Sequence, residues 1–203
     1  APLALGVTSL IFEGTPDYPA QDRWWDMIER HGVTILYTTP TAIRMFMKFG
    51  EQLVLKHDIS TLRLLGTVGE AINPEAWRWY YRVIGKERLP IIDTWWQTET
   101  GGILIANYPC MSIKLGSMGK PIPGITASVV SDKGKVLPIK KIGNLAIKPP
   151  WPSMMKEIWK NPKKYKSYFN KKWYITGDLA FRDKEGYFWF VGRSDDVIKT
   201  AGE

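Results

Sequence analysis

Hydrophobic and polar positions along the first half of the chain form blocks that are typical of strands alternating with helices. Four short apolar runs bounded by glycine, proline or polar turns predict strands at residues 7–12, 33–37, 62–68 and 89–93. Apolar residues at helical spacing predict helices at residues 19–31, 42–49 and 73–84. Gly32 ends the first of these helices, and Asn73 with Pro74 begins the last. This alternation predicts a parallel sheet flanked by helices.

After residue 102 the pattern changes to short β-rich segments separated by glycine and proline. These segments predict strands at residues 116–118, 126–131, 143–148, 173–176, 179–182 and 187–192. The basic stretch at residues 154–169 has the spacing of a helix. We therefore expect an α/β fold in two parts. A parallel sheet flanked by helices occupies residues 1–107, and a smaller antiparallel, barrel-like β subdomain follows over residues 108–193.

The composition is that of a folded protein without a membrane anchor. Of the 203 residues, 44% are hydrophobic and 24% are charged, which is the balance of a chain that buries a core. No apolar run approaches the roughly 20 residues of a membrane helix, and the first five residues lack a basic leader. Cys110 is the only cysteine, which excludes an internal disulfide and a cysteine-based zinc cluster and fits a reducing cytoplasm.

The net charge of +8 is concentrated between Lys156 and Lys172, where aromatic residues are interleaved with the lysines. Such a pattern is compatible with single-stranded nucleic acid, which binds through phosphate contacts and base stacking. It is also typical of a solvated lysine-rich helix whose aromatic residues face inward and whose charge attracts anions generally. We favour the second interpretation because it is the commoner one, and nucleic acid is not an expected partner.

The most informative stretch is residues 91–102, where a short apolar run ends in threonines, an amide, a carboxylate and paired glycines. This is typical of a buried strand that opens into a ligand loop at the edge of an α/β sheet. Glu99 supplies a hard oxygen of the kind that magnesium takes together with substrate phosphates. Taken alone, the residues fit equally well a pair of core tryptophans, Trp95 and Trp96, followed by an ordinary turn.

Three further positions carry candidate chemistry. Residues 69–71, Gly-Glu-Ala, follow a predicted strand, and the glycine would let the backbone face a flat ligand, although a plain turn is the commoner interpretation. Asp178 has a carboxylate that can accept hydrogen bonds from both hydroxyls of a ribose. Arg193 offers a forked donor for ribose or phosphate oxygens. Asp178 and Arg193 could instead form an ion pair with each other.

Four motifs in order, VGEAINPEAW, TWWQTETGG, YITGDLA and GRSDDVIKTAGE, closely resemble the AMP-forming acetyl-CoA synthetases of the acyl-adenylate-forming superfamily. The resemblance runs over essentially the whole chain. It implies contacts with the nucleotide through Gly69, Glu70, Ala71, Asp93, Thr94, Trp95, Gln97, Thr98, Asp178 and Arg193. Ala71 departs from the proline that is usual in this motif, which removes one source of loop rigidity.

The resemblance also implies an acyl pocket and a metal site. Trp96 would cap the pocket for the acid, with Val68 as another wall, so that the expected acid is acetate, with propionate second. Glu99 would bind the magnesium ion that bridges the ATP phosphates, and Thr98 and Glu99 would be the catalytic positions. ATP, magnesium and CoA are therefore the expected substrates and cofactors, and the expected partners are these small molecules rather than a membrane.

The last ten residues resemble a hinge in the same family. Asp195 matches the position about which a small carboxy-terminal domain turns, and Ala201 and Gly202 match a segment near CoA, although Glu203 departs from the pattern there. We expect residues 194–203 to be this hinge, and the chain to be a fragment of a cytoplasmic acetate:CoA ligase. The fragment lacks the upstream phosphate loop and the carboxy-terminal lysine, so we expect it to be inactive alone. The alternatives are a related ligase for a different small acid or a basic nucleic-acid-binding module.

Overall fold

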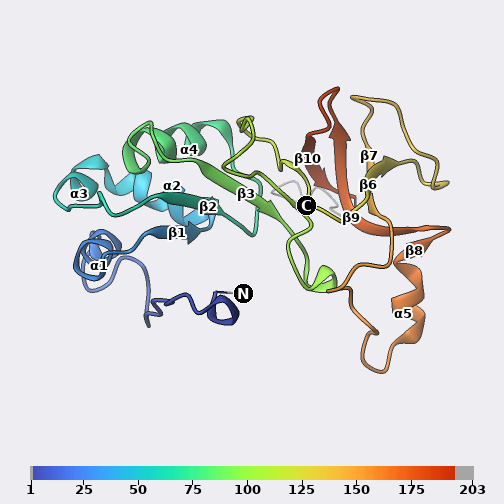
Figure 1. Cartoon of the computed structure of the whole chain (residues 1–203), viewed down its shortest axis with the longest axis horizontal. Helices are drawn as coiled ribbons and strands as arrows, with labels where there is room; N and C mark the ends of the chain where they lie inside the picture. The colour runs from blue at the N-terminus through green and yellow to red at the C-terminus, as the bar shows by residue number, and fades with distance from the viewer. Residues whose placement is uncertain (1, 195–203) are drawn as a thin grey trace, which may run out of the picture.

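The computed structural model of the chain describes residues 2–194, which form two sheets side by side (Figure 1). The first sheet has the strand order β1-β2-β3-β4-β5. Its strands are β1 (Ile35–Thr38), β2 (Leu64–Thr67), β3 (Ile91–Trp95), β4 (Ile105–Ala106) and β5 (Lys120–Pro121). The first three strands are parallel, and β4 and β5 are antiparallel additions. The parallel sheet predicted for the first half is confirmed.

Helices group around the first sheet, as Figure 1 shows at the blue and green end of the molecule. They are α1 (Arg23–His31), α2 (Pro40–Phe49), α3 (Glu51–Leu55) and α4 (Pro74–Trp79). The short 3-10 turn η1 (Leu3–Leu5) lies apart from them near the N-terminus and buries none of its residues. A π-helical turn, η2 (Tyr80–Ile84), continues α4. Asn73 caps α4 by accepting a hydrogen bond from the Ala76 amide at 2.7 Å, and Gly32 ends α1 in the left-handed conformation. Both boundary signals predicted from the sequence are confirmed.

The second sheet is antiparallel and follows the order β10-β9-β7-β6, with β8 paired to β9. Its strands are β6 (Ala127–Val130), β7 (Gly143–Ile147), β8 (Phe169–Asn170), β9 (Trp173–Arg182) and β10 (Phe188–Arg193), and α5 (Pro162–Ser167) precedes β8. Among the described residues this sheet is open, because β6 and β10 are its edges. Trp95 and Ile105 of the first sheet share one hydrophobic cluster with Leu145, Tyr174 and Phe188 of the second. That shared core fixes the two sheets against each other.

Three predicted elements are wrong. Residues 7–12 form no strand, since no strand in the described part of the chain pairs with them, and Ile11 is 89% exposed. The helix expected at residues 154–169 shrinks to α5, because it begins only where Asn161 caps the chain and Pro162 takes the first helical position. Residues 116–118, expected as a strand, form none either.

Strand β9 and strand β5 differ from the strands and the boundary expected from the sequence. Residues 173–176 and 179–182, expected as two strands, form the single strand β9, which passes through Gly177. The boundary at residue 108 and the hinge that begins at residue 194 stay predictions. Strand β5 lies beyond residue 108 and still pairs with β4 of the first sheet.

None of the described helices is both long enough and apolar enough to cross a membrane.

A candidate adenylate pocket between the two sheets

A cavity of about 330 Å³ opens where the first sheet meets β9 and β10. Strands β2 and β3 are parallel, with Thr67 opposite Asp93, so the segments that follow them emerge at the same sheet edge. The cavity is lined by Gly69, Glu70, Ala71, Asp93, Thr94, Trp95, Trp96, Gln97, Met118, Asp178, Phe190 and Arg193. Two loops predicted to share an edge therefore meet, and Trp96 and Asp178 lie in one cavity although they are far apart in the sequence.

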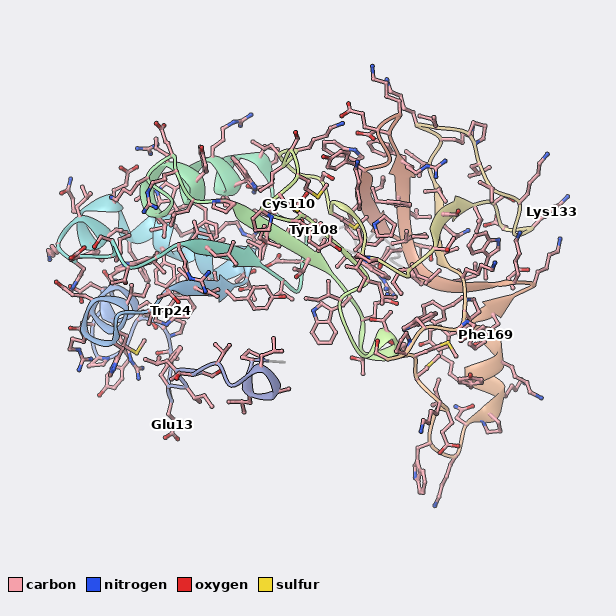
Figure 2. All side chains as sticks on the ribbon, viewed as in Figure 1. Glu13, Trp24, Tyr108, Cys110, Lys133 and Phe169 are labelled. Carbon is pink, nitrogen blue, oxygen red and sulfur yellow. The ribbon has the colours of Figure 1, made fainter. Side chains whose placement is uncertain are left out.

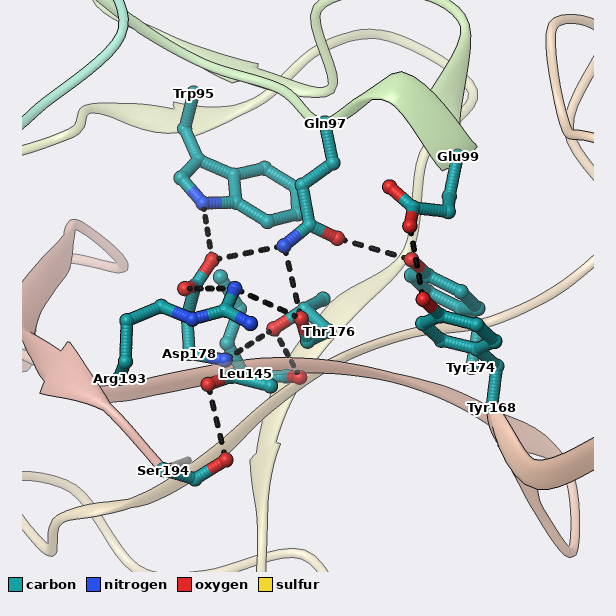
Figure 3. Close-up of polar contacts among 11 residues, drawn as sticks. Trp95, Gln97, Glu99, Leu145, Tyr168, Tyr174, Thr176, Asp178, Arg193 and Ser194 are labelled. Carbon is teal, nitrogen blue, oxygen red and sulfur yellow. Dashed lines mark hydrogen bonds and ion pairs between the residues drawn. The ribbon is translucent and has the colours of Figure 1, made fainter. Parts of the chain in front are cut away.

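Asp178 is a buried carboxylate of the cavity with partners on both of its oxygens. It is 4% exposed, and its Oδ2 accepts hydrogen bonds from Trp95 Nε1 at 2.8 Å and Gln97 Nε2 at 3.2 Å (Figure 3). Its Oδ1 forms an ion pair with Arg193 Nη1 at 3.0 Å. The ion pair left open from the sequence is thus present, and both of its members line the cavity. Donors from two sheets hold this carboxylate in one orientation.

Strand β9 places Asp178 by a local irregularity. Gly177 has a φ of +78°, a conformation that favours glycine, and a Cβ at this position would lie 3.0 Å from Arg193 Nη2 and press on the guanidinium group. Thr176 Oγ1 accepts a hydrogen bond from the Asp178 amide at 3.0 Å and donates one to the Leu145 carbonyl at 3.0 Å. The turn within β9 is therefore secured to β7, and Asp178 is fixed with it.

Two tyrosines behind the cavity hold the polar residues of the 97–99 segment (Figure 3). Tyr174 donates a hydrogen bond to Gln97 Oε1 at 2.9 Å, and Tyr168 donates one to Glu99 Oε1 at 2.9 Å. Burial, together with the charge of Glu99, raises the pKa of Tyr174, so its hydroxyl stays a donor at neutral pH. Sequence reasoning missed both tyrosines. Tyr174 begins the YITGDLA motif, which was the one signal that could have indicated it.

Asp93 lies at the floor of the cavity and is 6% exposed. Its Oδ1 accepts hydrogen bonds from Thr67 Oγ1 at 2.7 Å and from the Thr94 amide at 3.1 Å. Burial raises the pKa of Asp93 to about 7, against the opposing effect of these two hydrogen bonds. Thr94 Oγ1 in turn donates to the Thr67 carbonyl at 2.8 Å and lies 2.7 Å from the Tyr37 hydroxyl. The floor is thus a network within the parallel sheet.

Three predicted site residues lie beside the cavity rather than in its lining. Val68 is half-buried, and its amide bonds the Thr38 carbonyl at 3.0 Å. Thr98 and Glu99 belong to the 3-10 turn η3 (Thr98–Thr100), which continues from Gln97. The remaining predicted positions, Asp195, Ala201 and Gly202, lie outside the described residues. All other predicted site residues line the cavity together.

Glu99, the carboxylate predicted to bind magnesium, lies beside the cavity in the turn η3. Within residues 2–194 no group of three or more His, Cys, Asp or Glu side chains is arranged to hold a metal ion. Glu99 provides a single carboxylate oriented by Tyr168. Magnesium commonly uses one or two carboxylates and keeps water and phosphate oxygens for its other positions, so this arrangement fits a magnesium ion that arrives with a nucleotide.

The lysine-rich segment packs its aromatic residues mainly inward. Phe169 lies where α5 joins the second sheet (Figure 2), and its ring contacts those of Tyr165 and Tyr174 at centroid distances of 5.1 and 5.9 Å. Trp173 is 3% exposed, and only Trp159 stands out, at 77%. Most of the rings that base stacking would need are therefore occupied, which favours the solvated helix over a nucleic-acid surface.

Comparison with known proteins agrees with this geometry. A family model described as AMP-binding enzyme matches residues 1–159. The acetyl-coenzyme A synthetases of Rubrobacter xylanophilus and Methylobacillus flagellatus are each 54% identical to this chain over 99% of its length, and that of Pyrobaculum arsenaticum is 53% identical over the same share. The chain spans about a third of these relatives, 32%, 32% and 31% of their lengths respectively.

A solved structure extends the likeness to the fold. The anthranilate CoA ligase AuaEII, crystallised in complex with anthranoyl-AMP, superposes with a TM-score of 0.83 and 32% sequence identity, over 98% of this chain and 36% of that one. The resemblance to acetyl-CoA synthetases inferred from the four sequence motifs is confirmed by these relatives. With the family model matched over most of its length, the chain belongs to the AMP-binding enzyme family.

Proposed function

We propose that this chain provides the adenylate pocket of an acetate:CoA ligase. In the first step a carboxylate oxygen of acetate attacks the α-phosphorus of ATP, which forms acetyl-AMP and releases pyrophosphate. In the second step the thiol of CoA attacks the acetyl carbonyl and AMP leaves. The observation that carries the proposal is the cavity that Trp96 and Asp178 share, because it joins a candidate acyl position to a candidate ribose position. The relatives named acetyl-CoA synthetase support it.

The nucleotide side of the pocket would use the two polar walls. Asp178 offers carboxylate oxygens suited to ribose hydroxyls, and Arg193 beside it offers donors for ribose or phosphate oxygens. The backbone of residues 69–71 and the indole of Trp95 would border the base. In this proposal the ribose hydroxyls replace some of the present hydrogen bonds of Asp178 and Arg193. These side chains are already held in place, so few polar groups have to be reorganised on binding.

The acyl side would be closed by the indole of Trp96. This side chain lines the cavity and is 45% exposed, so its volume occupies space that a longer acid would need. One methylene is worth roughly 1–3 kcal/mol of discrimination in such a pocket. Acetate is accordingly the proposed acid, with propionate second, and Val68, which follows β2 beside the cavity, would limit the same space.

ATP, magnesium and CoA complete the proposal. Glu99 would hold a magnesium ion, whose charge offsets the negative charge that builds up on the phosphates. Contacts of CoA with Ala201 and Gly202, and a hinge at Asp195, belong to the proposal without support from the described residues. A cytoplasmic location is likewise proposed, on the basis of the single cysteine.

Isothermal titration of the intact ligase that carries this chain would test the proposal. We expect binding of a non-hydrolysable acetyl-AMP analogue and no binding of a single-stranded oligonucleotide. The Asp178→Ala variant should lose most of the analogue affinity. Tighter binding of a butyryl-AMP analogue would indicate a ligase for a different acid. Salt-dependent oligonucleotide binding without adenylate binding would replace the proposal by the nucleic-acid interpretation.

A further inference from the structure

Glu70 is one of the residues that line the cavity, and its side chain is held by the first turn of a neighbouring helix. Glu70 Oε1 accepts hydrogen bonds from the Thr41 amide at 2.8 Å and from the Thr41 hydroxyl. Glu70 Oε2 forms an ion pair with Arg44 Nη2 at 2.9 Å. Arg44 Nη2 also donates to Thr41 Oγ1 at 2.8 Å, so the three side chains form one closed network.

The anchor of this network is rigid. Thr41 and Arg44 belong to α2, whose Ile43 and Phe46 are 1% and 2% exposed in the core. The Glu70 carboxylate sits at the amino-terminal end of this helix, where the unpaired amides and the helix dipole favour a negative charge. Partial burial opposes ionisation, but the bonds from Thr41 and Arg44 outweigh it, so the pKa of Glu70 is lowered and the group is charged at neutral pH.

The loop itself has few other restraints. Residues 69–71 are exposed, and Gly69 has a φ of +93°, with Thr39 Cγ2, at 3.8 Å, the one atom of the described residues that a Cβ on this glycine would meet. In the part of the chain that the structure describes, the Ala71 amide donates no hydrogen bond within the chain. A glycine and an alanine in an exposed turn leave the backbone much conformational freedom.

We propose that Thr41 and Arg44 are positioning residues for nucleotide recognition. They hold the Glu70 side chain, and through it they keep the backbone of residues 69–71 in the shape that lines the cavity. The tether supplies a restraint that neither Gly69 nor Ala71 provides by its own conformation. The inference rests on the proposed function, because it assigns the loop a nucleotide to recognise. It assigns Glu70 a role through its side chain that is distinct from any contact of its backbone with the base.

The physical effect is positional rather than a matter of global stability. Arg44 and Glu70 are each 38% exposed at their side chains, and exposed ion pairs contribute little to the stability of a fold. A restrained loop, in contrast, does not have to be ordered when the ligand binds, so the ligand binds more tightly. Loss of the tether should therefore weaken binding and leave the unfolding transition nearly unchanged.

The test uses Arg44→Met in the intact ligase, with titration of the acetyl-AMP analogue and hydrogen exchange of the loop amides without ligand. We expect the Kd of the analogue to rise about five-fold, and the amides of residues 69–71 to exchange several-fold faster. Glu70→Gln, which keeps the shape of the side chain and removes its charge, should give a smaller rise in Kd. Arg82→Met is the matched control, because it breaks an exposed Arg–Glu pair of the same kind, with Glu51, away from the cavity.

The decisive measurement is a rescue. In an Arg44→Met, Ala71→Pro double variant the Kd should return to within about two-fold of the original value. Proline fixes φ at position 71 and so restrains the unliganded loop without the tether. A role of Arg44 in the fold alone would not be rescued by a proline in the loop. Unchanged affinity and exchange in Arg44→Met, or failure of the rescue, would overturn the inference. If the unsubstituted ligase bound no adenylate, the proposed function would fail, and hydrogen exchange alone would still decide whether the tether restrains the loop.

Discussion

The two walls of the cavity present a contrast in how a polar surface is held in place. On the wall formed by Asp178, Trp95 and Gln97, which we call the buried wall, the carboxylate is 4% exposed and accepts hydrogen bonds from both neighbours. On the wall formed by residues 69–71, which we call the exposed wall, every residue is exposed and the restraint comes from one side chain, that of Glu70.

The difference teaches where the cost of a mutation should appear. A buried polar group without its partner loses its hydration and gains nothing in return, so damage to the buried wall should reduce stability as well as binding. The exposed wall is solvated with or without its tether, so damage there should reduce binding alone.

Asp178→Ala should be the most damaging single change. It removes the acceptor of Trp95 Nε1 and Gln97 Nε2 and the partner of Arg193. Trp95 Nε1 then becomes a buried donor without an acceptor, which costs about 1–3 kcal/mol of unfolding free energy, whereas Arg193, whose side chain is 38% exposed, stays partly solvated. Urea unfolding should show this loss, and titration of the acetyl-AMP analogue should show at least a hundredfold weaker binding, on the order of 3 kcal/mol.

Asp183→Asn provides the control for this prediction. Asp183 pairs with Lys114 at 2.6 Å in the hairpin between β9 and β10 and does not line the cavity. Its pKa is lowered to about 2, because hydrogen bonds, first among them that of Lys114, outweigh the opposing effect of burial. This variant should lose stability and bind the analogue normally. Normal binding by Asp178→Ala would remove the functional side of the contrast.

Asp93, at the floor of the cavity, should make the stability of the protein depend on pH. Its pKa is raised from 3.8 to about 7 by burial, so between these values the folded state holds a proton that the unfolded state releases. The corresponding stabilisation is complete below pH 4 and is lost as the pH rises through 7. Between pH 4 and pH 8 the unfolding free energy of the unsubstituted protein should therefore fall by up to about 4 kcal/mol more than that of Asp93→Asn. Urea unfolding of both proteins from pH 4 to 8 measures the difference, and parallel pH profiles would contradict the prediction.

The sequence allowed the edge of the first sheet to be predicted because its signals are local. A cap at Asn73, a stop at Gly32 and short apolar runs define elements from neighbouring residues alone. Parallel strands then bring residues 69–71 and 93–97 to one edge without further information. By contrast, the strand expected at residues 7–12 needs a pairing partner, and no local pattern reveals whether one is present.

The buried wall shows what local signals leave out. Trp95 and Asp178 are 83 positions apart, and their hydrogen bond depends on how the two sheets pack. The sequence also presents Trp95 and Trp96 as equals, yet they are 8% and 45% exposed. Successive residues of a strand point to opposite faces, so one of the two had to be buried, but which one depends on the second sheet. Only the resemblance to a family separated their roles in advance.

These adjacent tryptophans offer a third test of the contrast. Trp96→Gly should leave stability nearly unchanged and improve the use of butyrate relative to acetate, by roughly 1–3 kcal/mol for each methylene admitted. Trp95→Phe should instead lower the unfolding free energy by about 1–3 kcal/mol, because Asp178 loses a buried donor. Its preference among acids should not change. The kcat/KM values for acetate, propionate and butyrate measure one effect and urea unfolding the other. An unchanged chain-length profile in Trp96→Gly would refute the acyl pocket.

The smallest effect is expected at Tyr168, which lies behind the buried wall and reaches Glu99 through its hydroxyl at 2.9 Å. Tyr168→Phe keeps the ring, which stacks on Tyr174 at a centroid distance of 5.6 Å, and removes the hydrogen bond that orients the carboxylate. A net hydrogen bond is worth about 1 kcal/mol or less at such a half-exposed site. The magnesium concentration needed for half-maximal activity should therefore rise roughly three-fold. Tyr165→Phe is the control, since Tyr165 lies in α5, which Tyr168 follows directly, and packs on Phe169. Equal magnesium requirements in the two variants would show that the Tyr168 hydroxyl does not orient Glu99 for a metal. The ordered polar network of the buried wall would then not extend beyond Gln97 to Glu99.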